Sequence, residues 1–385
     1  MIKISLRPNL KYLVQLIVYS FSRNISEIIM GRLLNFKIDL IYLPLMFLGE
    51  FLFGLIFYLC QKKYLHKISR DEKTKLSSIE LIYDEITYNE DSEQGLKLLI
   101  MIFFISFFDF IEFVLSVGEI PKFFLISNTI VSRFAGIFIL TQAIFYRYQL
   151  KIQIYKHQKL SLIIVSMCLI ITIITEFIFQ DINIFFGYYE FVFCIIIIII
   201  IQIFNSFIDL IEKYLFHFHN LNPYKCLFLE GAFGLIFSFI YMIYENPLPD
   251  LTRYYNNNSD IFIYLMLLLI VFVILSGLKN AYRVITIKIY SPIASALAEY
   301  FLNPIYVIIS FSLFGDFISN GSRNFVFFLI NLILSIFISF SGCIYNELLI
   351  LFCCKLEHNT YHQISFRAEL HQSGILYGED DEDDL

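Results

Sequence analysis

The chain has 385 residues, of which 58% are hydrophobic and only 16% charged, and its mean hydropathy is +0.71. This composition supplies too little polar surface to cover a soluble globule of that length, so it excludes a soluble globular protein and predicts a chain largely dissolved in lipid. The net charge of −6 is concentrated in an acidic run at residues 379–384, which is typical of a solvated tail.

A helix needs about 20 mostly apolar residues to cross the hydrocarbon core of a bilayer. The long apolar runs are continuous and lack the alternation of a membrane barrel, so helices are predicted throughout. The predicted fold class is therefore an all-α polytopic membrane protein with ten transmembrane helices. In chain order, the ten predicted spans cover residues 9–31, 37–61, 95–117, 121–149, 157–179, 183–212, 223–245, 260–280, 285–314 and 325–353.

The distribution of basic residues predicts the orientation. If the N-terminus is cytosolic, 21 of the 28 Lys and Arg residues lie in cytosolic segments and five lie in the outer connections. Because basic residues favour the cytosolic side, both termini are predicted to be inside.

The ten spans divide into two five-helix halves, residues 1–181 and 182–354. A cytosolic loop of mixed charge is expected at residues 62–94, and a disordered cytosolic tail at residues 355–385. Five is an odd number, so the second half must enter the membrane from the opposite side. A duplication would therefore be an inverted repeat, an arrangement that suits alternating access.

Two similar segments support this division. Span two contains Glu50 in the segment EFLFGLIF, and span seven contains Glu230 in the segment EGAFGLIF. A five-helix repeat makes these spans equivalent. We therefore expect Glu50 and Glu230 to be symmetry mates that face a shared interior, with a role in coupling.

Charged residues within the spans indicate where function lies, since an ionised group at mid-membrane costs at least about 2.5–3.5 kcal/mol. Asp109 and Glu112 on span three lie close in depth to Arg133 on span four, which predicts an Arg133–carboxylate pair. This pair either binds substrate or only locks the two helices together. Arg23 and Glu27 are four residues apart on one helical face, and a structural pair is favoured for them.

Other charged residues are expected near the membrane surface. Asp209, Glu212 and Lys213 lie close to the inner end of span six and are expected to reach interfacial water. Lys279 and Arg283, at the inner ends of spans eight and nine, are expected to snorkel and to set the topology.

Span nine has the highest density of polar residues. Pro304 removes a backbone donor, so it is expected to kink the helix and to leave the carbonyl of Tyr300 as an acceptor. Glu299, Tyr300 and Asn303 then lie within about one turn. This patch is predicted to form part of a transport cavity. The complete set of candidate substrate-binding residues is Asp109, Glu112, Arg133, Glu299, Tyr300 and Asn303.

The ten spans in two halves, the segment EGAFGLIF in span seven and the polar span nine together resemble the drug/metabolite transporter superfamily. The chain is similar to divergent protist members related to the solute carrier 35 nucleotide-sugar and EamA-type carriers. The segments YKHQ (155–158) and CKLEHNT (354–360) add to the resemblance. It implies a substrate bound centrally between the halves, involving spans three, four, eight and nine.

The charges depart from this resemblance. A carrier of nucleotide sugars is expected to offer several buried cations, and only Arg23 and Arg133 are expected to lie deep. Cationic or zwitterionic metabolites, or proton coupling through Glu50 or Glu299, are therefore favoured. An endomembrane location (Golgi, vacuole or lysosome) is favoured over the plasma membrane.

The function predicted from these features is secondary-active transport or exchange of a small organic metabolite by alternating access. Two alternatives are a nucleotide-sugar transporter and a non-transporting scaffold or accessory subunit. An enzyme is not expected, because no histidine lies deep in a span. No cofactor, metal or nucleic acid is expected. The expected partners are the substrate and membrane lipids, and a homodimer is left open.

Overall fold

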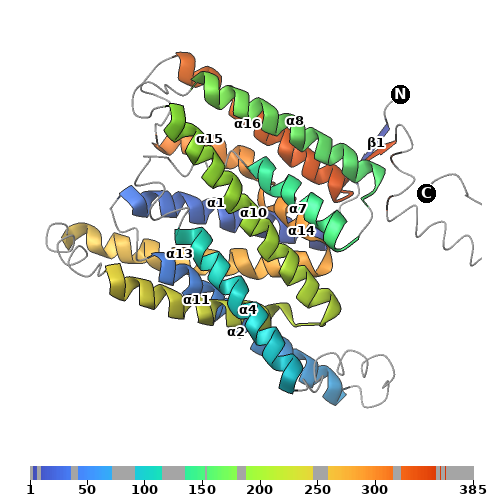
Figure 1. The fold of residues 1–385 in the computed structure, drawn as a ribbon, viewed down its shortest axis with the longest axis vertical. Coiled ribbons are helices and arrows are strands. Elements are labelled where there is room, and N and C mark those ends of the chain that lie inside the picture. Colours follow the sequence, from blue (N-terminus) through green and yellow to red (C-terminus); the bar gives the residue numbers. More distant parts are fainter. Residues whose placement is uncertain are drawn as a thin grey trace, which may run out of the picture.

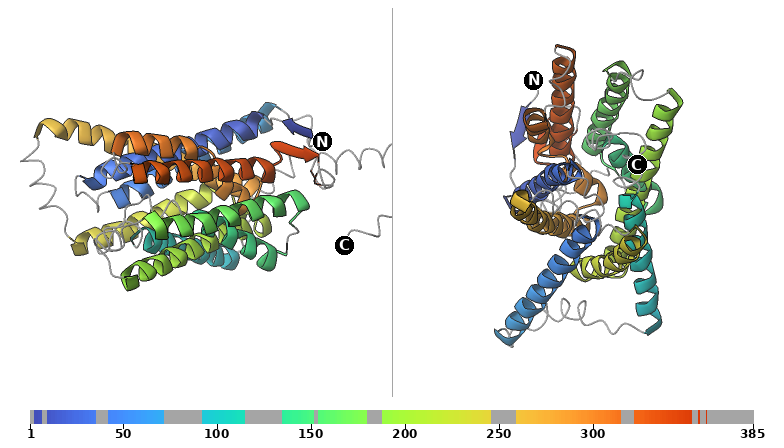
Figure 2. Two further views of the ribbon diagram at one scale, coloured as in Figure 1. Left: turned by 90° about the horizontal axis from the view of Figure 1, so that it is seen from above. Right: turned by 90° about the vertical axis from the view of Figure 1, so that its left-hand side faces the viewer.

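The computed structural model describes residues 3–6, 10–35, 42–71, 92–114, 135–151, 154–179, 188–245, 259–314, 322–352, 356 and 360. The described part is a bundle of long helices with one small sheet at its end (Figures 1 and 2). The helices are α1 (Leu10–Asn35), α2 (Tyr42–Asp71), α4 (Ser92–Phe113), α7 (Ala135–Gln149), α8 (Lys156–Phe179), α10 (Tyr188–Phe218), α11 (Pro223–Glu245), α13 (Ser259–Ile289), α14 (Pro292–Glu299), α15 (Asn303–Phe314) and α16 (Ser322–Tyr345).

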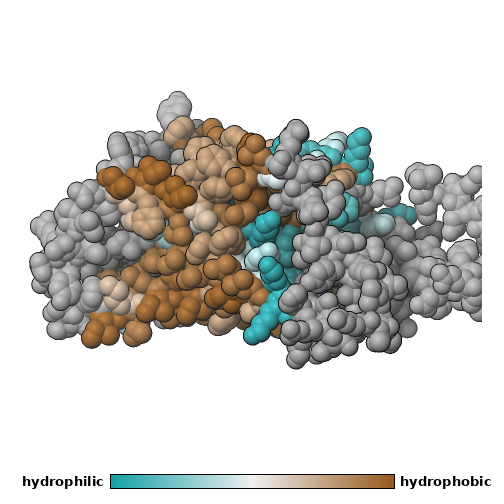
Figure 3. Space-filling model, turned by 90° about the horizontal axis from the view of Figure 1, so that it is seen from below, coloured by the Kyte–Doolittle hydropathy of each residue, from teal (hydrophilic) through white to brown (hydrophobic). Residues whose placement is uncertain are grey.

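The protein is an all-α polytopic membrane protein. Among the described residues, seven segments are long and apolar enough to cross a membrane: Leu43–Lys63, Lys156–Thr175, Ile195–Phe218, Pro223–Ile243, Ile263–Ile289, Pro292–Ile309 and Phe325–Tyr345. Large apolar side chains cover their outer faces; Ile243 is 81% exposed and Ile263 is 73% exposed. The face in Figure 3 is accordingly mostly apolar where it is described, with hydrophilic residues gathered toward one end. Such a surface suits contact with lipid tails.

Helices α2 and α11 pack closely against each other at the two similar sequence segments. A Cβ atom on Gly231 would lie 2.4 Å from the backbone nitrogen of Phe51, and one on Gly54 would lie 2.6 Å from that of Phe228. Only glycine permits this approach of the two backbones. The segments around Glu50 and Glu230 therefore meet at one helix crossing.

A second close pair is formed by α8 and α16. The hydroxyl groups of Ser161 and Ser341 lie 2.8 Å apart. Each hydroxyl also donates to the other residue's backbone carbonyl, at 2.9 Å from Ser161 and 3.1 Å from Ser341. The contact is therefore reciprocal.

The sheet consists of strands β1 (Lys3–Leu6) and β2 (Leu349–Phe352), which pair antiparallel with Lys3 opposite Phe352 and Leu6 opposite Leu349. The sheet was not predicted from the sequence, because four-residue strands beside long apolar helices leave no distinct periodic signal. The sheet ties the segment before α1 to the segment after α16.

Two boundaries differ from the sequence prediction. Helix α13 continues without a break to Ile289, whereas the predicted spans eight and nine were separated at residues 281–284. Helix α2 extends to Asp71, beyond the predicted start of the polar loop. In both places, charged residues were taken for loop, although Lys, Arg and Glu are good helix formers. Residues 72–91 and nearly all of the predicted acidic tail lie outside the described residues.

Candidate functional site

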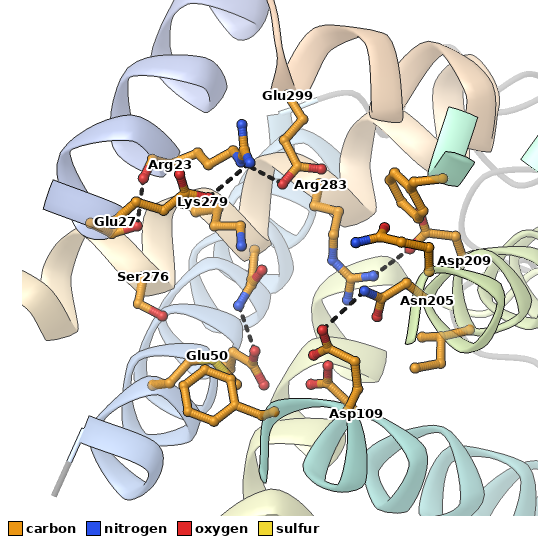
Figure 4. Close-up of a pocket in the computed structure, with 18 of the residues that line it drawn as sticks. Arg23, Glu27, Glu50, Asp109, Asn205, Asp209, Ser276, Lys279, Arg283 and Glu299 are labelled. Atoms are coloured by element: carbon orange, nitrogen blue, oxygen red, sulfur yellow. Dashed lines mark hydrogen bonds and ion pairs between the residues drawn. The ribbon is translucent and has the colours of Figure 1, made fainter. Parts of the chain in front are cut away.

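A cavity of about 220 Å³ opens between α1, α2, α4, α10, α13 and α14 (Figure 4). Its wall is rich in ionisable side chains. Among the residues that the structure describes, three cations line it, namely Arg23, Lys279 and Arg283. Six carboxylates also line it, namely Glu27, Glu50, Asp109, Glu112, Asp209 and Glu299. Negative groups therefore outnumber positive ones in the wall.

The first charged cluster lies between α1 and the end of α14. Nη2 of Arg23 lies 2.8 Å from Glu27 on the same helix, so the two residues pair as predicted. Nε of Arg23 lies 2.7 Å from Oε1 of Glu299. The guanidinium also stacks over the ring of Tyr300, 4.1 Å from its centroid, in a cation–π contact. Arg23 is thus held by one neighbour on its own helix and two groups from the predicted span nine.

The helix is interrupted between α14 and α15, and Glu299 and Tyr300 at this break line the cavity. Leu302 N donates to the hydroxyl of Ser20, at 2.7 Å, and that hydroxyl donates to the carbonyl of Glu299, at 3.0 Å. Pro304 has no N–H and so cannot donate to the carbonyl of Tyr300. That carbonyl instead accepts from Asn303 N at 3.1 Å and from the hydroxyl of Ser339 at 3.2 Å. Side chains of α1 and α16 thus satisfy the polar backbone that this break leaves in the membrane.

The second charged cluster lies between α10 and α13. Nη1 of Arg283 lies 2.6 Å from Asp209, and Nη2 lies 2.6 Å from Glu212. The same Nη2 lies 3.8 Å from Oε2 of Glu230 on α11. Asp209 also accepts from the amide of Gln142 on α7 at 2.5 Å. The guanidinium therefore connects helices from different parts of the chain.

Two amides position the remaining carboxylates. The Asn280 side chain donates to Glu50 at 2.5 Å, and the Asn205 side chain donates to Glu112 at 3.1 Å. Asn280 reaches Glu50 because α2 and α13 nearly touch at Gly49 and Gly277, where an added Cβ would lie 2.6 Å from a backbone oxygen. Both carboxylates are therefore bound by neutral donors.

Lys279 and Asp109 differ from the other charged residues in the wall. Neither makes a hydrogen bond or a salt bridge to another residue within the described part of the chain. They come from α13 and α4, respectively, and both line the cavity. These two side chains are therefore available to a bound molecule.

The structure places most, but not all, of the predicted site residues at this cavity. Asp109, Glu112, Glu299, Tyr300 and Glu50 line it. The other three predicted residues have different positions. Asn303 begins α15 and is not in the lining. Glu230 is not in the lining either, and its Oε2 lies 3.8 Å from Nη2 of Arg283. Arg133 lies outside the described residues, and so does the predicted Arg133–carboxylate pair.

The expectation that the charged residues of spans six, eight and nine reach the membrane surface is wrong. Lys279, Arg283 and Asp209 line the cavity, and Glu212 is fully buried. Lys213 is 8% exposed, and its ammonium donates to three carbonyls at the end of α13, those of Ile287, Lys288 and Tyr290, at 3.0, 3.0 and 3.2 Å. The error arises because α10 and α13 continue past the predicted span ends, to Phe218 and Ile289, so these residues do not lie at a helix end.

A periodic signal could have found the missed residues. Four polar residues lie on one face of α13, because their spacings are three, one and three residues: Ser276, Lys279, Asn280 and Arg283. Gln202, Asn205, Asp209 and Glu212 form a similar polar stripe on α10. Because the other faces of both helices are apolar, these two polar stripes predict the sides that face the interior of the bundle.

No group of three or more His, Cys, Asp or Glu side chains in the described ranges is arranged to hold a metal ion. Comparison with known proteins identifies no relative: no protein-family model matches the chain, and no curated protein matches it.

Proposed function

We propose that the chain is a secondary-active transporter that carries a small organic metabolite by alternating access, with the substrate bound in the charged cavity. The observation that carries this proposal is a polar cavity within a membrane bundle, walled by residues of both predicted halves, such as Glu50 and Asp109 from the first and Arg283 and Glu299 from the second. Ionisable residues within a membrane bundle usually face a partner or a pathway for solutes. The resemblance of the sequence to drug/metabolite transporters agrees with this proposal.

The packing of the helices supports an inverted repeat of two five-helix halves. If α1, α2, α4, α7 and α8 correspond to α10, α11, α13, the α14–α15 pair and α16, then each prominent helix contact has a counterpart. Helix α2 packs on α13 as α11 packs on α4, and α1 packs on α13 as α10 packs on α4. Helices α2 and α11, and likewise α8 and α16, pack on each other. A two-fold relation produces such self-matching contacts.

Two residue pairs agree with the same relation. Ser161 and Ser341 are 180 residues apart and bond reciprocally. Glu50 and Glu230 have the same separation in the sequence and lie on the two helices that cross at Gly54 and Gly231. A carrier built on this symmetry has two arrangements of similar energy, one open to each side of the membrane.

The excess of carboxylates favours coupling to protons or to a cation. Six carboxylates face three cations in the wall, and an uncompensated buried charge is unfavourable. Protonation of Glu50, or of Glu299 when it separates from Arg23, would reduce this excess of negative charge and link transport to a proton gradient. Glu230 would act with Arg283 on the other side of the α2–α11 crossing.

The cavity argues against the two alternative functions. Its volume of about 220 Å³ is below the roughly 300–1,000 Å³ of pockets for drug-sized ligands, which disfavours a nucleotide sugar. Both arginines in the wall are already paired with carboxylates, so neither is free for a diphosphate. A scaffold would be expected to have fully paired charges, unlike Lys279 and Asp109.

The proposal is tested by uptake into proteoliposomes across a panel of metabolites, with and without an imposed pH gradient. We expect gradient-dependent uptake of at least one solute, and an initial rate at least about tenfold lower in Glu299→Gln, because one charge-assisted bond to Arg23 is weakened. Glu347→Gln is the matched control, since Glu347 lies beyond α16, outside the cavity lining.

Two outcomes would contradict the proposal. Uptake no greater than in empty liposomes for every solute would favour the scaffold function. Unchanged transport in Glu299→Gln would remove the α14–α15 break from the site. The proposed orientation, with both termini cytosolic in an endomembrane, is tested separately by protease accessibility of terminal tags in intact organelles.

A further inference from the structure

The charged residues of the cavity separate into two arginine-centred clusters of ion pairs and a remainder without ion pairs. Arg23 is paired with Glu27 and Glu299, and Arg283 with Asp209 and Glu212. The described residues of the wall that remain outside these clusters are one cation, Lys279, and three carboxylates, Glu50, Asp109 and Glu112. The amide donors on Glu50 and Glu112 supply hydrogen bonds but no positive charge.

The remainder is also separated in space. Figure 4 shows Arg23 and Lys279 toward one side of the cavity, and Glu50 and Asp109 toward the opposite side. On the cationic side, Arg23 is 3% exposed, and its Nη1 has no hydrogen-bond partner among the residues that the structure describes. One side thus offers unused donors to an anion, and the other offers carboxylates to a cation.

We propose that the substrate is a small zwitterion, an amino-acid-like metabolite with one ammonium and one carboxylate. Asp109 and Glu112 bind its ammonium, and Lys279, next to Arg23, binds its carboxylate. Each end of such a molecule finds a side chain of opposite charge, so that both are stabilised by charge-assisted hydrogen bonds. This inference rests on the proposed transport function and assigns the substrate class of the same cavity.

The size of the cavity agrees with this assignment. A volume of about 220 Å³ accommodates a molecule of a few carbon atoms and excludes a nucleotide or an oligosaccharide. Ser276 and Gln202 line the same space and can complete the hydrogen bonding of either charged group.

Equilibrium binding to the purified full-length protein in lipid nanodiscs tests the inference without requiring transport. The probes are neutral α-amino acids with side chains of different sizes. For each amino acid that binds, the matched probes are its amine without the carboxylate and its acid without the ammonium; for leucine these are 3-methylbutylamine and 4-methylpentanoate. We expect the amino acid to bind at least about tenfold more tightly than either, since each lacks one charge-assisted contact.

Two variants assign the ends of the ligand. Lys279→Gln should weaken binding of the amino acid about tenfold and leave binding of the amine unchanged, whereas Asp109→Asn should weaken both. Lys63→Gln is the matched control, because Lys63 is exposed near the end of α2 and is outside the cavity lining. If Lys279→Gln fails to fold, Lys279→Arg retains the charge with a different geometry and should still prefer the amino acid over the amine.

Three results would overturn the inference: no amino acid binds, the amine or the acid binds as tightly as the amino acid, or Lys279→Gln weakens the amine as much as the amino acid. If proteoliposomes nevertheless accumulate another solute, the transport function stands and only the substrate class fails. If no solute is taken up although amino acids bind, the proposed function fails and the binding site stands.

Discussion

The two arginine clusters of the cavity look alike in composition but differ in how they join the helices. In each, one guanidinium is paired with two carboxylates at 2.6–2.8 Å, and Arg283 has Glu230 as a third, at 3.8 Å. Arg23 takes Glu27 from its own helix, whereas both carboxylates of Arg283, Asp209 and Glu212, lie on another helix. A contact within one helix persists when helices move relative to each other, but a contact between helices must break or slide. The Arg283 cluster is therefore the stronger candidate for a lock between two conformations.

Burial reinforces this difference. Arg23 is paired with Glu27 and Glu299, whose side chains are 22% and 14% exposed. Arg283 is paired with Asp209 and Glu212, whose side chains are only 5% and 0% exposed. Removal of one partner from a buried pair leaves an uncompensated charge, which is more costly than the pair itself is stabilising. The two clusters should therefore respond differently to the same substitution.

The largest expected effect follows removal of the arginine whose carboxylate partners are the more deeply buried. Arg283→Met leaves Asp209 and Glu212 without a cation, and we expect it to lower the free energy of unfolding by about 3–5 kcal/mol. The measurement is SDS-induced unfolding in mixed micelles. Arg147→Met, at an exposed position near the end of α7, is the matched control. A loss below about 1 kcal/mol would show that α10 and α13 are not held together through this guanidinium.

A smaller loss is expected at the other arginine. Arg23→Met should lower the free energy of unfolding by about 2 kcal/mol in the same assay, because Glu27 and Glu299 retain partial access to polar surroundings. A double-mutant cycle with Glu27→Gln should show a coupling that stays similar in the two transport states. The same cycle for Arg283 and Glu212 should differ between them. Equal losses for the two arginines would remove the proposed distinction.

The smallest expected effect concerns the backbone beside the Arg23 cluster. Ser20→Ala removes the hydroxyl that bridges Leu302 N and the carbonyl of Glu299. The unsatisfied backbone groups cost about 1–3 kcal/mol, and apolar burial offsets part of this cost. We therefore expect the free energy of unfolding to fall by about 1 kcal/mol. Ser166→Ala is the control, since that hydroxyl bonds only within its own helix, to the carbonyl of Leu162. If Ser20→Ala is no more costly than this control, the bridge does not hold the α14–α15 break.

The interior of α10 and α13 shows where sequence reasoning reached its limit. Asp109, Glu112 and Glu299 were expected to bind the substrate, because each is a carboxylate in a long apolar run, and all three line the cavity. Lys279 and Arg283 were assigned to the membrane surface, because basic residues near a span end usually snorkel. That choice depended on where the helix ends, and apolar length alone does not determine a helix end when the following residues also form helices well.

The sequence by itself determined that this chain lies in a membrane, that its long segments are helices and that acidic residues are carried into the bundle. Each follows from local composition, since the cost of placing backbone and side chains in lipid is incurred by each segment separately. Only the tertiary structure decided that Glu299 reaches Arg23, that Asp209 and Glu212 take Arg283, and that Lys279 and Asp109 stay available in the cavity. Partner choice depends on the close approach of α2, α11 and α13 at their glycines, and such interhelix distances are set by packing among segments far apart in the sequence.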